Sequence, residues 1–526
     1  MNDTLQLGPF QFGERIGAGG MGAVYRARHV GTDVDVALKV LPHGGDEAAR
    51  RRFHREVQAQ AELTHSGIVY LFEYGTVDPE VAARSDDLVA ESPYVAMELA
   101  ETGTLQDQRP LQDWRQLRDV LLQVLDALAF AHARDVIHRD LKPENVLVFK
   151  DAWSAGQSTM NVKLADFGLA HPFEDERERD LESLRSAAGT PFYMPPEQAR
   201  GDWRAYGPWT DLYSIGCIAW ELVCGHPPFA SDNPLAVIVE HEEAERPPLE
   251  PQFRVPASLE AWIHRAMAPR PEARFRRAAD AARALPPLSD SPPDAERAST
   301  DSKWPPANPD HELTNQALAP TITPVLPDTV PFDSKETPTS EPTRSNADVG
   351  EGNLGDDPTA ERSTLRSIGT ESPGPDSLPS TWRTDATGEA PPPLVGTGLG
   401  LFGLREVPFV DRNAHRDTLW ESLRTVVENR ESRVLLLAGE AGTGKSRLAD
   451  WIATRAHEVG AAHLLKAVHA PGGGGRAEGL PGMVRRAFHT WQLSRGETYQ
   501  RLCHELPLDV LRRDLRCSLW KLCSRL

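Results

Sequence analysis

The pattern of hydrophobic and polar positions divides the chain into regions that differ in periodicity and composition. Residues 10–285 carry short hydrophobic runs typical of strands, separated by longer segments with helical spacing. One helical segment has an apolar stripe of the kind that packs on a core. The stripe comprises Leu117, Val120, Leu121, Val124, Leu125 and Leu128. This mixture predicts an α+β domain over residues 10–285.

Residues 286–400 have a different composition. They are rich in Pro, Ser, Thr, Asp and Gly and contain few aromatic residues. Such a segment cannot bury enough apolar area to offset the conformational entropy of an ordered chain. We therefore expect a disordered linker over 286–400, and hydrophobic periodicity returns over 401–526.

The charge balance limits the classes of partner. The net charge is -20, from 77 acidic and 57 basic residues, which disfavours nucleic acid or a membrane surface as the main partner. The sequence shows neither a signal-peptide pattern nor an apolar run long enough to span a membrane. The five cysteines form no Cys-x-x-Cys pair. We expect a cytoplasmic protein without a disulfide framework.

Residues 138–145, HRDLKPEN, place a carboxylate, an amine and a carboxamide at fixed offsets on a predicted loop. Phosphoryl transfer uses such groups: Asp140 can accept a proton from a substrate hydroxyl, Lys142 can neutralise charge on the moving phosphoryl group, and Asn145 can hold magnesium. The segment resembles the catalytic loop of protein kinases, and Lys142 resembles the serine/threonine class. The resemblance implies a two-lobed α+β kinase fold, ATP and Mg²⁺ as cofactors, and protein Ser/Thr hydroxyls as acceptors.

A glycine-rich segment lies near the start of the predicted domain. Gly17, Gly19 and Gly22 follow the spacing G-x-G-x-x-G, with Val24 two residues later. Glycines let backbone N–H groups approach phosphates without an intervening Cβ. The spacing also fits a dinucleotide-binding turn, but a predicted strand over 23–27 follows instead of a helix and disfavours that reading. The segment resembles the phosphate-covering loop of bacterial serine/threonine kinases.

The resemblance implies further nucleotide-binding and metal-binding residues. Lys39 follows Ala37 on a predicted strand and is similar to the lysine that pairs with the α- and β-phosphates. Glu56, on the predicted helix after it, would orient Lys39. Asp166 begins a D-F-G motif downstream of the 138–145 loop and would bind magnesium.

The same resemblance covers the adenine and substrate sides of the site. Met97 would be the gatekeeper, and the backbone of Glu98 and Ala100 would bond adenine. Thr190 would bond Asp140 and Lys142 and is a further mark of Ser/Thr specificity.

Four charged residues are implied in supporting roles. Glu197 would pair with Arg274, and Asp211 would brace the catalytic loop from a buried helix. Arg139 would meet a phosphorylated residue after the D-F-G motif. Ser183 and Ser186 are the candidate phosphosites, which predicts autophosphorylation of this segment.

The sequence departs from the kinase pattern in a few places. Pro195 replaces the alanine of the A-P-E motif, and His171 stands where a basic residue often binds an activating phosphate. Gln60 lies one turn after Glu56, where kinases usually carry an apolar residue. A buried Gln without partners would cost roughly 1–3 kcal/mol, so this predicts an active position of the helix that is either less populated or dependent on a partner. Residues 75–91 and 149–160 are expected to form long loops.

A second phosphate-binding motif lies near the C-terminus. Residues 434–438 predict a buried strand, followed by G-x-x-x-x-G-K-S with Gly439, Gly444, Lys445 and Ser446 and a helix over 447–456. This resembles the start of an AAA-type ATPase of the signal-transduction sort. No apolar strand with a terminal acid follows within residues 446–526. The sequence therefore predicts a partial α/β P-loop segment over 401–526, either a fragment or a degenerate module, and predicts no hydrolysis there.

These motifs favour a serine/threonine protein kinase that acts in bacterial signal transduction. A first alternative is a non-catalytic scaffold that binds ATP, disfavoured by the intact Lys39, Asp140, Asn145 and Asp166. A second alternative is that the C-terminal module is an ATP-driven switch that carries the main function, with the kinase as an accessory. Protein substrates are the expected partners, and a kinase homodimer is left open.

Overall fold

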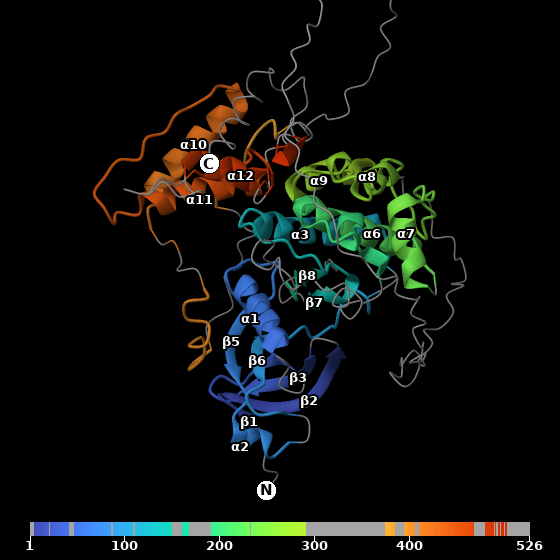
Figure 1. Ribbon diagram of the computed structural model, residues 1–526, viewed down its shortest axis with the longest axis vertical. Coiled ribbons are helices and arrows are strands. Elements are labelled where there is room, and N and C mark those ends of the chain that lie inside the picture. Colours follow the sequence, from blue (N-terminus) through green and yellow to red (C-terminus); the bar gives the residue numbers. More distant parts are fainter. Residues whose placement is uncertain are drawn as a thin grey trace, which may run out of the picture. The chain divides into compact units, whose positions relative to one another are not determined.

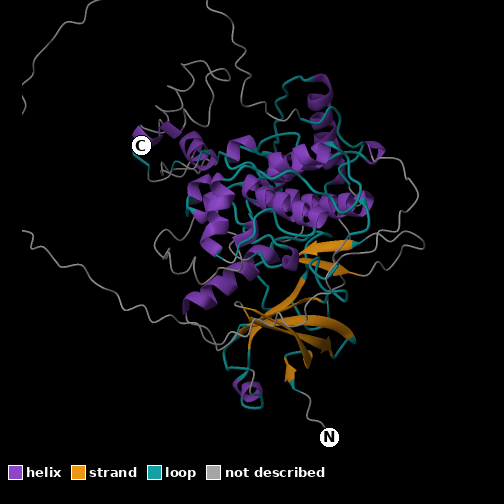
Figure 2. Cartoon of the chain, turned by 90° about the vertical axis from the view of Figure 1, so that its right-hand side faces the viewer, coloured by secondary structure: helices purple, strands orange, loops and turns teal. Residues whose placement is uncertain are grey.

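The computed structural model describes residues 5–19, 22–41, 47–85, 88–108, 111–149, 160–167, 191–231, 233–290, 374–383, 394–405, 409, 411–467, 479–488, 490, 493–494, 496–498 and 500–501. Within residues 5–290 six of the eight described strands form the sheet of an N-terminal lobe, and most helices lie in a second lobe (Figure 2). This is the two-lobed arrangement expected from the sequence.

The N-terminal lobe is built on an antiparallel sheet of six strands in the order β1-β2-β3-β4-β6-β5. The strands are β1 (Gln6–Leu7), β2 (Phe10–Gly19), β3 (Gly22–His29), β4 (Val34–Val40), β5 (Leu71–Thr76) and β6 (Pro93–Glu98). The central strand β4 is buried on both faces: Leu38 joins one hydrophobic cluster and Ala37 the other. Helix α1 (Glu47–Ala61) covers the second face and contributes Phe53 to that cluster.

The second lobe is organised around two long helices, α3 (Trp114–His132) and α6 (Pro208–Cys224). The Asp113 side chain accepts a hydrogen bond from Gln116 N and caps the start of α3. The predicted apolar stripe of α3 is buried, which confirms its role in the core. Helix α6 is buried on all sides and ends at Gly225, whose φ of 82° suits a left-handed cap.

Shorter elements complete the described chain. Strands β7 (Val146–Phe149) and β8 (Asn161–Leu164) form a hairpin beside α3. The short helices of the second lobe are α5 (Pro196–Ala199), α7 (Pro234–Glu243), α8 (Ser258–Ala266) and α9 (Ala278–Ala284). Helix α2 (Pro79–Ala82) lies inside the long loop predicted over 75–91. The C-terminal helices are α10 (Asn413–Asn429), α11 (Lys445–Glu458) and α12 (Gly479–Ala487), all labelled in Figure 1. None of the helices that the structure describes combines the length and hydropathy needed to cross a membrane.

The structure differs from the linker prediction between residues 394 and 400. Leu394 is buried in the hydrophobic cluster of the N-terminal lobe, and Gly398 and Gly400 donate backbone hydrogen bonds to Glu73 of β5. The average composition of residues 286–400 concealed this short apolar stretch, because a few well-placed leucines suffice to dock a segment on an existing core.

The prediction of a buried strand over residues 434–438 is wrong. These residues have no regular secondary structure, and the side chains of Val434 and Leu436 are 97% and 90% exposed. A strand needs neighbouring strands for its backbone hydrogen bonds, and the regular elements described from residue 374 onward are all helices. The predicted helix after the P-loop motif is present as α11.

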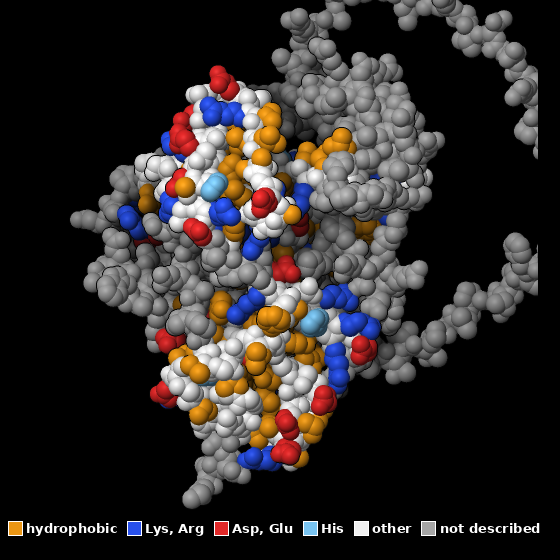
Figure 3. All heavy atoms as spheres, turned by 90° about the vertical axis from the view of Figure 1, so that its left-hand side faces the viewer, with side chains coloured by type: hydrophobic (Ala, Val, Ile, Leu, Met, Phe, Trp, Pro, Cys, Tyr) orange, Lys and Arg blue, Asp and Glu red, His pale blue; other side chains and the backbone are white. Residues whose placement is uncertain are grey.

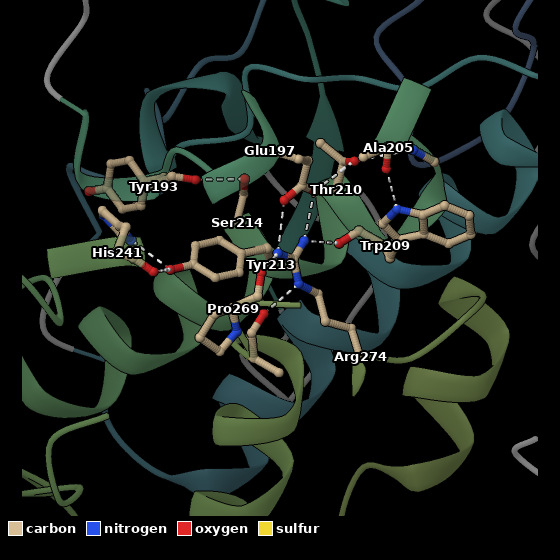
Figure 4. Close-up of polar contacts among 12 residues, drawn as sticks. Tyr193, Glu197, Ala205, Trp209, Thr210, Tyr213, Ser214, His241, Pro269 and Arg274 are labelled. Carbon is tan, nitrogen blue, oxygen red and sulfur yellow. Dashed lines mark hydrogen bonds and ion pairs between the residues drawn. The ribbon is translucent and has the colours of Figure 1, made fainter. Parts of the chain in front are cut away.

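A buried ion pair fixes α5 to the end of the second lobe (Figure 4). Glu197 Oε1 and Oε2 lie 2.8 and 2.9 Å from Arg274 Nη1 and Nη2, and both side chains are almost fully buried. Thr210 Oγ1 also donates to Glu197, and Arg274 donates to the backbone oxygens of Trp209 and Pro269. Because these groups satisfy one another, loss of either charge would leave the other uncompensated.

The variant Glu197→Gln should therefore lose stability. Removing one partner of a buried pair typically costs about 3–5 kcal/mol, which we expect as a lower urea midpoint followed by circular dichroism. Glu242→Gln is the matched control, because Glu242 pairs with Arg200 at 2.6 Å on the surface, where pairs contribute about 0–1 kcal/mol. Equal midpoints for the two variants would contradict the role given to the buried pair.

Candidate active site

Lys39 joins three parts of the chain. It lies on β4, paired with Val24 of β3 and Val95 of β6, and its Nζ lies 2.8 Å from Glu56 Oε1 of α1. The same Nζ lies 2.8 Å from Asp166 Oδ1, just beyond β8. The ion pair expected between Lys39 and Glu56 is therefore present, and the structure adds Asp166 to it.

The pKa values of Lys39, Glu56 and Asp166 are set by their burial and by their mutual charges. Burial favours the neutral amine of Lys39, but the carboxylates of Asp166 and Glu56 outweigh it and raise the pKa of Lys39 above its ordinary value. Burial raises the pKa of Glu56, an effect that Lys39 opposes. Burial also acts to raise the pKa of Asp166, but the charge of Lys39 holds that pKa below its usual range. The ammonium therefore stays charged and is poised to meet anionic oxygens.

The three residues predicted on the 138–145 loop lie together. Lys142 Nζ and Asn145 Nδ2 each lie 3.0 Å from Asp140 Oδ2, and Asn145 Nδ2 also donates to the Asp140 backbone oxygen at 2.6 Å. The turn Pro143–Asn145 folds the loop back on itself and brings these groups into contact. Asp140 and Lys142 remain partly exposed, so a substrate hydroxyl has access to them.

Asn145 and Asp166 are held next to one another by backbone contacts. Val146 pairs with Leu164 in the β7–β8 hairpin, and Ala165 N donates to Asn145 O at 3.0 Å. Because the Asn145 amide nitrogen donates to Asp140, its amide oxygen is left as an acceptor. Carboxylate and carboxamide oxygens are the ligands that Mg²⁺ prefers, so these two side chains fit a magnesium ion.

Asp211 supports the loop from α6, as the sequence predicted. Its Oδ2 accepts from His138 N at 2.9 Å and from His132 Nε2 at 2.7 Å, and its Oδ1 accepts from Arg139 N at 2.8 Å. Burial acts to raise the pKa of Asp211, but hydrogen bonds from His132 and the Arg139 amide hold it below its usual range. Arg139 has a φ of 63°, a conformation that costs free energy outside glycine and that these bonds maintain.

His132 is a supporting residue that the sequence alone did not identify. It lies on α3 four residues after Leu128, and this position predicts burial but not a partner. The contact with Asp211 arises only because α3 and α6 pack together.

The glycine-rich segment forms the β2–β3 hairpin. Gly17 pairs with Val24 and Gly19 with Gly22, and Gly22 has a φ of 143°. Such a backbone is open to glycine and strained for other residues. The intervening residues 20–21 lie outside the described part.

The predicted adenine side of the site lies on β4 and β6. Ala37 pairs with Met97, and both side chains are buried. Glu98 donates its backbone N–H to Tyr70 O at 3.0 Å, and its carboxylate accepts from Lys163 Nζ at 2.6 Å. Ala100 follows as a half-buried residue. The structure brings these residues together at the end of β6.

Several predicted residues lie outside the described part of the chain. These are Thr190, the phosphosites Ser183 and Ser186, and His171. The predicted cost at Gln60 does not arise, because its Nε2 donates to Val69 O at 2.8 Å. Gln60 is buried with a partner, so it gives no reason to expect a less populated active position of α1.

The C-terminal motif forms a turn before α11. Gly439 and Gly444 have φ values of 157° and 81°, and Lys445 Nζ donates to Glu440 O at 2.6 Å. Ser446 lies in the first turn of α11. Lys445 and Ser446 are thus placed at a helix N-terminus, but the exposed segment over 434–436 shows no sheet beside them.

The turn Pro191–Tyr193 lies just before Pro195, the residue that replaces the alanine of the A-P-E motif (Figure 4). Ser214 Oγ donates to Tyr193 O at 2.8 Å, and the Tyr193 hydroxyl donates to Glu221 at 2.5 Å. Nearby, Tyr213 Oη of α6 lies 2.7 Å from Nδ1 of His241 on α7. The His241 residue is fully buried. Burial, assisted by Arg246, lowers the pKa of His241 to about 4.

Comparisons with known proteins agree with this geometry. A family model described as protein kinase domain matches residues 10–280. The chain is 32% identical over 301 residues to serine/threonine-protein kinase PknB of Mycobacterium leprae, covering 56% of this chain and 45% of that protein. PknB of Mycobacterium tuberculosis is 33% identical over 304 residues, with the same coverage of 56% and 45%. Serine/threonine-protein kinase pkn3 of Myxococcus xanthus is 36% identical over 267 residues, covering 49% and 45%. The chain spans about half the length of the curated relatives that it matches.

The buried His241 predicts a pH-dependent stability. Unfolded His binds a proton near 6.5 and the folded residue only near 4, so the unfolded state binds more protons between these values. Stability conferred by neutral His241 is therefore present above pH 6.5 and is lost as the pH falls towards 4, by up to roughly 3 kcal/mol. We expect urea unfolding of His241→Gln to depend less on pH across this window than that of the wild type.

His226→Gln is the control for this prediction. His226 is exposed in the same lobe, so its replacement should leave the pH dependence of unfolding unchanged. Identical pH dependence in the wild type and His241→Gln would show that His241 does not titrate as its burial demands.

Proposed function

The chain belongs to the protein kinase domain family, and from that premise we propose that it transfers the γ-phosphoryl group of ATP to Ser and Thr hydroxyls of proteins. The observation that carries this proposal is the convergence of an ammonium, a loop carboxylate and two metal-compatible side chains. Lys39, Asp140, Asn145 and Asp166 provide these groups. The bacterial relatives named as serine/threonine-protein kinases support the same substrate class. We propose that this activity serves bacterial signal transduction.

Each side chain then has a defined task. Lys39, oriented by Glu56, binds the α- and β-phosphates, and Gly17, Gly19, Gly22 and Val24 cover them. Ala37 and Met97 line the adenine site, with the backbone of Glu98 and Ala100 bonding the base. Asn145 and Asp166 hold Mg²⁺, which when bound neutralises charge on the β- and γ-phosphates.

Asp140 and Lys142 act on the transferred group. Asp140 orients the acceptor hydroxyl and takes its proton, while the hydroxyl oxygen forms a bond to the γ-phosphorus and the bond to the ADP oxygen breaks. Lys142, at 3.0 Å from Asp140, stabilises the developing negative charge. Thr190 is proposed to bond both residues and to favour Ser/Thr substrates.

We propose that residues 10–285 form the catalytic domain, that residues 401–526 form a partial P-loop module, and that the intervening residues link the two. Gly439, Gly444, Lys445 and Ser446 would bind phosphate groups, a role supported by the turn before α11. ATP use and the buried free thiols of Cys217 and Cys224 favour the reducing cytoplasm as the setting.

The central test is Asp140→Asn in the full chain. Loss of a positioned proton acceptor should lower the transfer of labelled phosphate from ATP to a protein substrate by at least about 100-fold. Glu144→Gln, an exposed position on the same loop, is the matched control and should keep wild-type activity. Equal transfer by Asp140→Asn and the wild type would contradict the proposed catalysis and favour the alternative of a non-catalytic scaffold that binds ATP.

We further propose that the chain phosphorylates its own Ser183 and Ser186 and that Arg139 then pairs with the phosphate. Arg139 is suited to this because α6 fixes its backbone through Asp211. The double variant Ser183→Ala/Ser186→Ala should incorporate less phosphate, measured by mass spectrometry, and transfer phosphate more slowly. Ser258→Ala, at the exposed start of α8, should match the wild type. Unchanged incorporation and rate in the double variant would refute the proposal.

A further inference from the structure

A segment far from the kinase domain in sequence lies against the N-terminal lobe. Residues 394–405 run beside β5 and α1, to the left of them in Figure 1, and the face that carries them is turned towards the viewer in Figure 3. We call residues 394–405 the docking segment. None of the proposed catalytic groups belongs to it.

The docking segment has a polar anchor on β5. The Glu73 carboxylate accepts from Gly398 N through Oε2 at 2.6 Å and from Gly400 N through Oε1 at 2.7 Å. Glu73 is buried, so these two backbone amides supply the hydrogen bonds that water would otherwise provide. A Cβ on Gly400 would overlap the backbone oxygen of Tyr74, so glycine permits this close approach.

Two further contacts lie towards the ends of the docking segment. Val395 O lies 2.9 Å from His29 Nε2. At the other end, Arg405 donates to Leu71 O and stacks over the Tyr70 ring, 4.5 Å from its centroid. The whole segment is thus attached, rather than a single residue.

The apolar contacts are selective. Leu401 is 0% exposed and belongs to the cluster that contains Phe53 and Val57 of α1, whereas its neighbours Leu399 and Phe402 are 82% and 90% exposed. General hydrophobic collapse would not bury one of three adjacent large side chains so completely. The contrast indicates a specific seat for Leu401 beside α1.

This seat has a direct relation to the active site. Phe53 and Val57 flank Glu56 on α1, and Glu56 holds Lys39 at 2.8 Å while Leu401 occupies its seat. We propose that residues 394–405 are an intramolecular docking segment that holds α1 where Glu56 meets Lys39. Its influence on phosphoryl transfer rests on the function proposed above, but the docking itself does not.

The test uses the full chain with Leu401→Asp and the matched control Leu399→Asp. A charge at the seat of Leu401 should expel the segment, whereas a charge at exposed Leu399 should be tolerated. Hydrogen exchange of the α1 amides should become faster in Leu401→Asp alone. Phosphoryl transfer should fall about 10-fold in the same variant, equivalent to ~1.4 kcal/mol.

Two further experiments distinguish loss of docking from a general folding defect in Leu401→Asp. A peptide with the sequence of residues 394–405 should restore α1 protection and transfer to Leu401→Asp, while the same peptide with aspartate at 401 should not. Glu73→Gln, which weakens only the polar anchor, should change α1 exchange in the same direction.

The outcomes separate the two proposals. Unchanged α1 exchange in both Leu401→Asp and Glu73→Gln would overturn the docking, and faster phosphoryl transfer in Leu401→Asp would overturn its supporting role. If the wild type transferred no phosphate, the proposed function would fail, and hydrogen exchange would still decide whether the segment docks on α1.

Discussion

The buried ammonium of Lys39 is the interaction on which the site depends. It is contributed by the sheet, and it is neutralised by Glu56 from α1 and by Asp166 from the region that follows β8. A charge in this position is tolerable only while its partners are in place, because an unpaired buried ion is costly. The three elements are therefore coupled: moving α1 or Asp166 changes the environment of the same amine. Such coupling is the physical route by which the docking segment is proposed to act on the site through the position of α1.

The second lobe supplies a rigid support for the loop that carries Asp140. Asp211 fixes the backbone at His138 and Arg139, and Glu197 with Arg274 fixes α5 to the end of the lobe. Both supports are buried carboxylates with every contact supplied by side chains or backbone amides. They give the loop a defined geometry, so Asp140, Lys142 and Asn145 need few contacts of their own and stay accessible to substrate.

Local patterns predicted the elements of the kinase region well. The strand that carries Lys39, the stripe of α3 and the turn through the 138–145 loop all formed where periodicity and motif spacing placed them. The prediction at residues 434–438 was wrong because an apolar run specifies burial only if other strands are present to pair with it. Gln60 shows the reverse case: a polar residue at an apolar position found a backbone partner, which no property of the adjacent sequence indicated.

The sequence by itself determined which chemical groups are available and in what order: the glycine turn, the amine, the loop carboxylate and the oxygen ligands. Their types and spacings are local properties, and local backbone preference and burial act over a few residues. Only the tertiary structure decided which groups meet across long separations, such as Asp211 with His132, Lys39 with Asp166, and Leu401 with the face of α1. These contacts depend on how whole elements pack, and packing is set by the shape of the entire core rather than by any one segment.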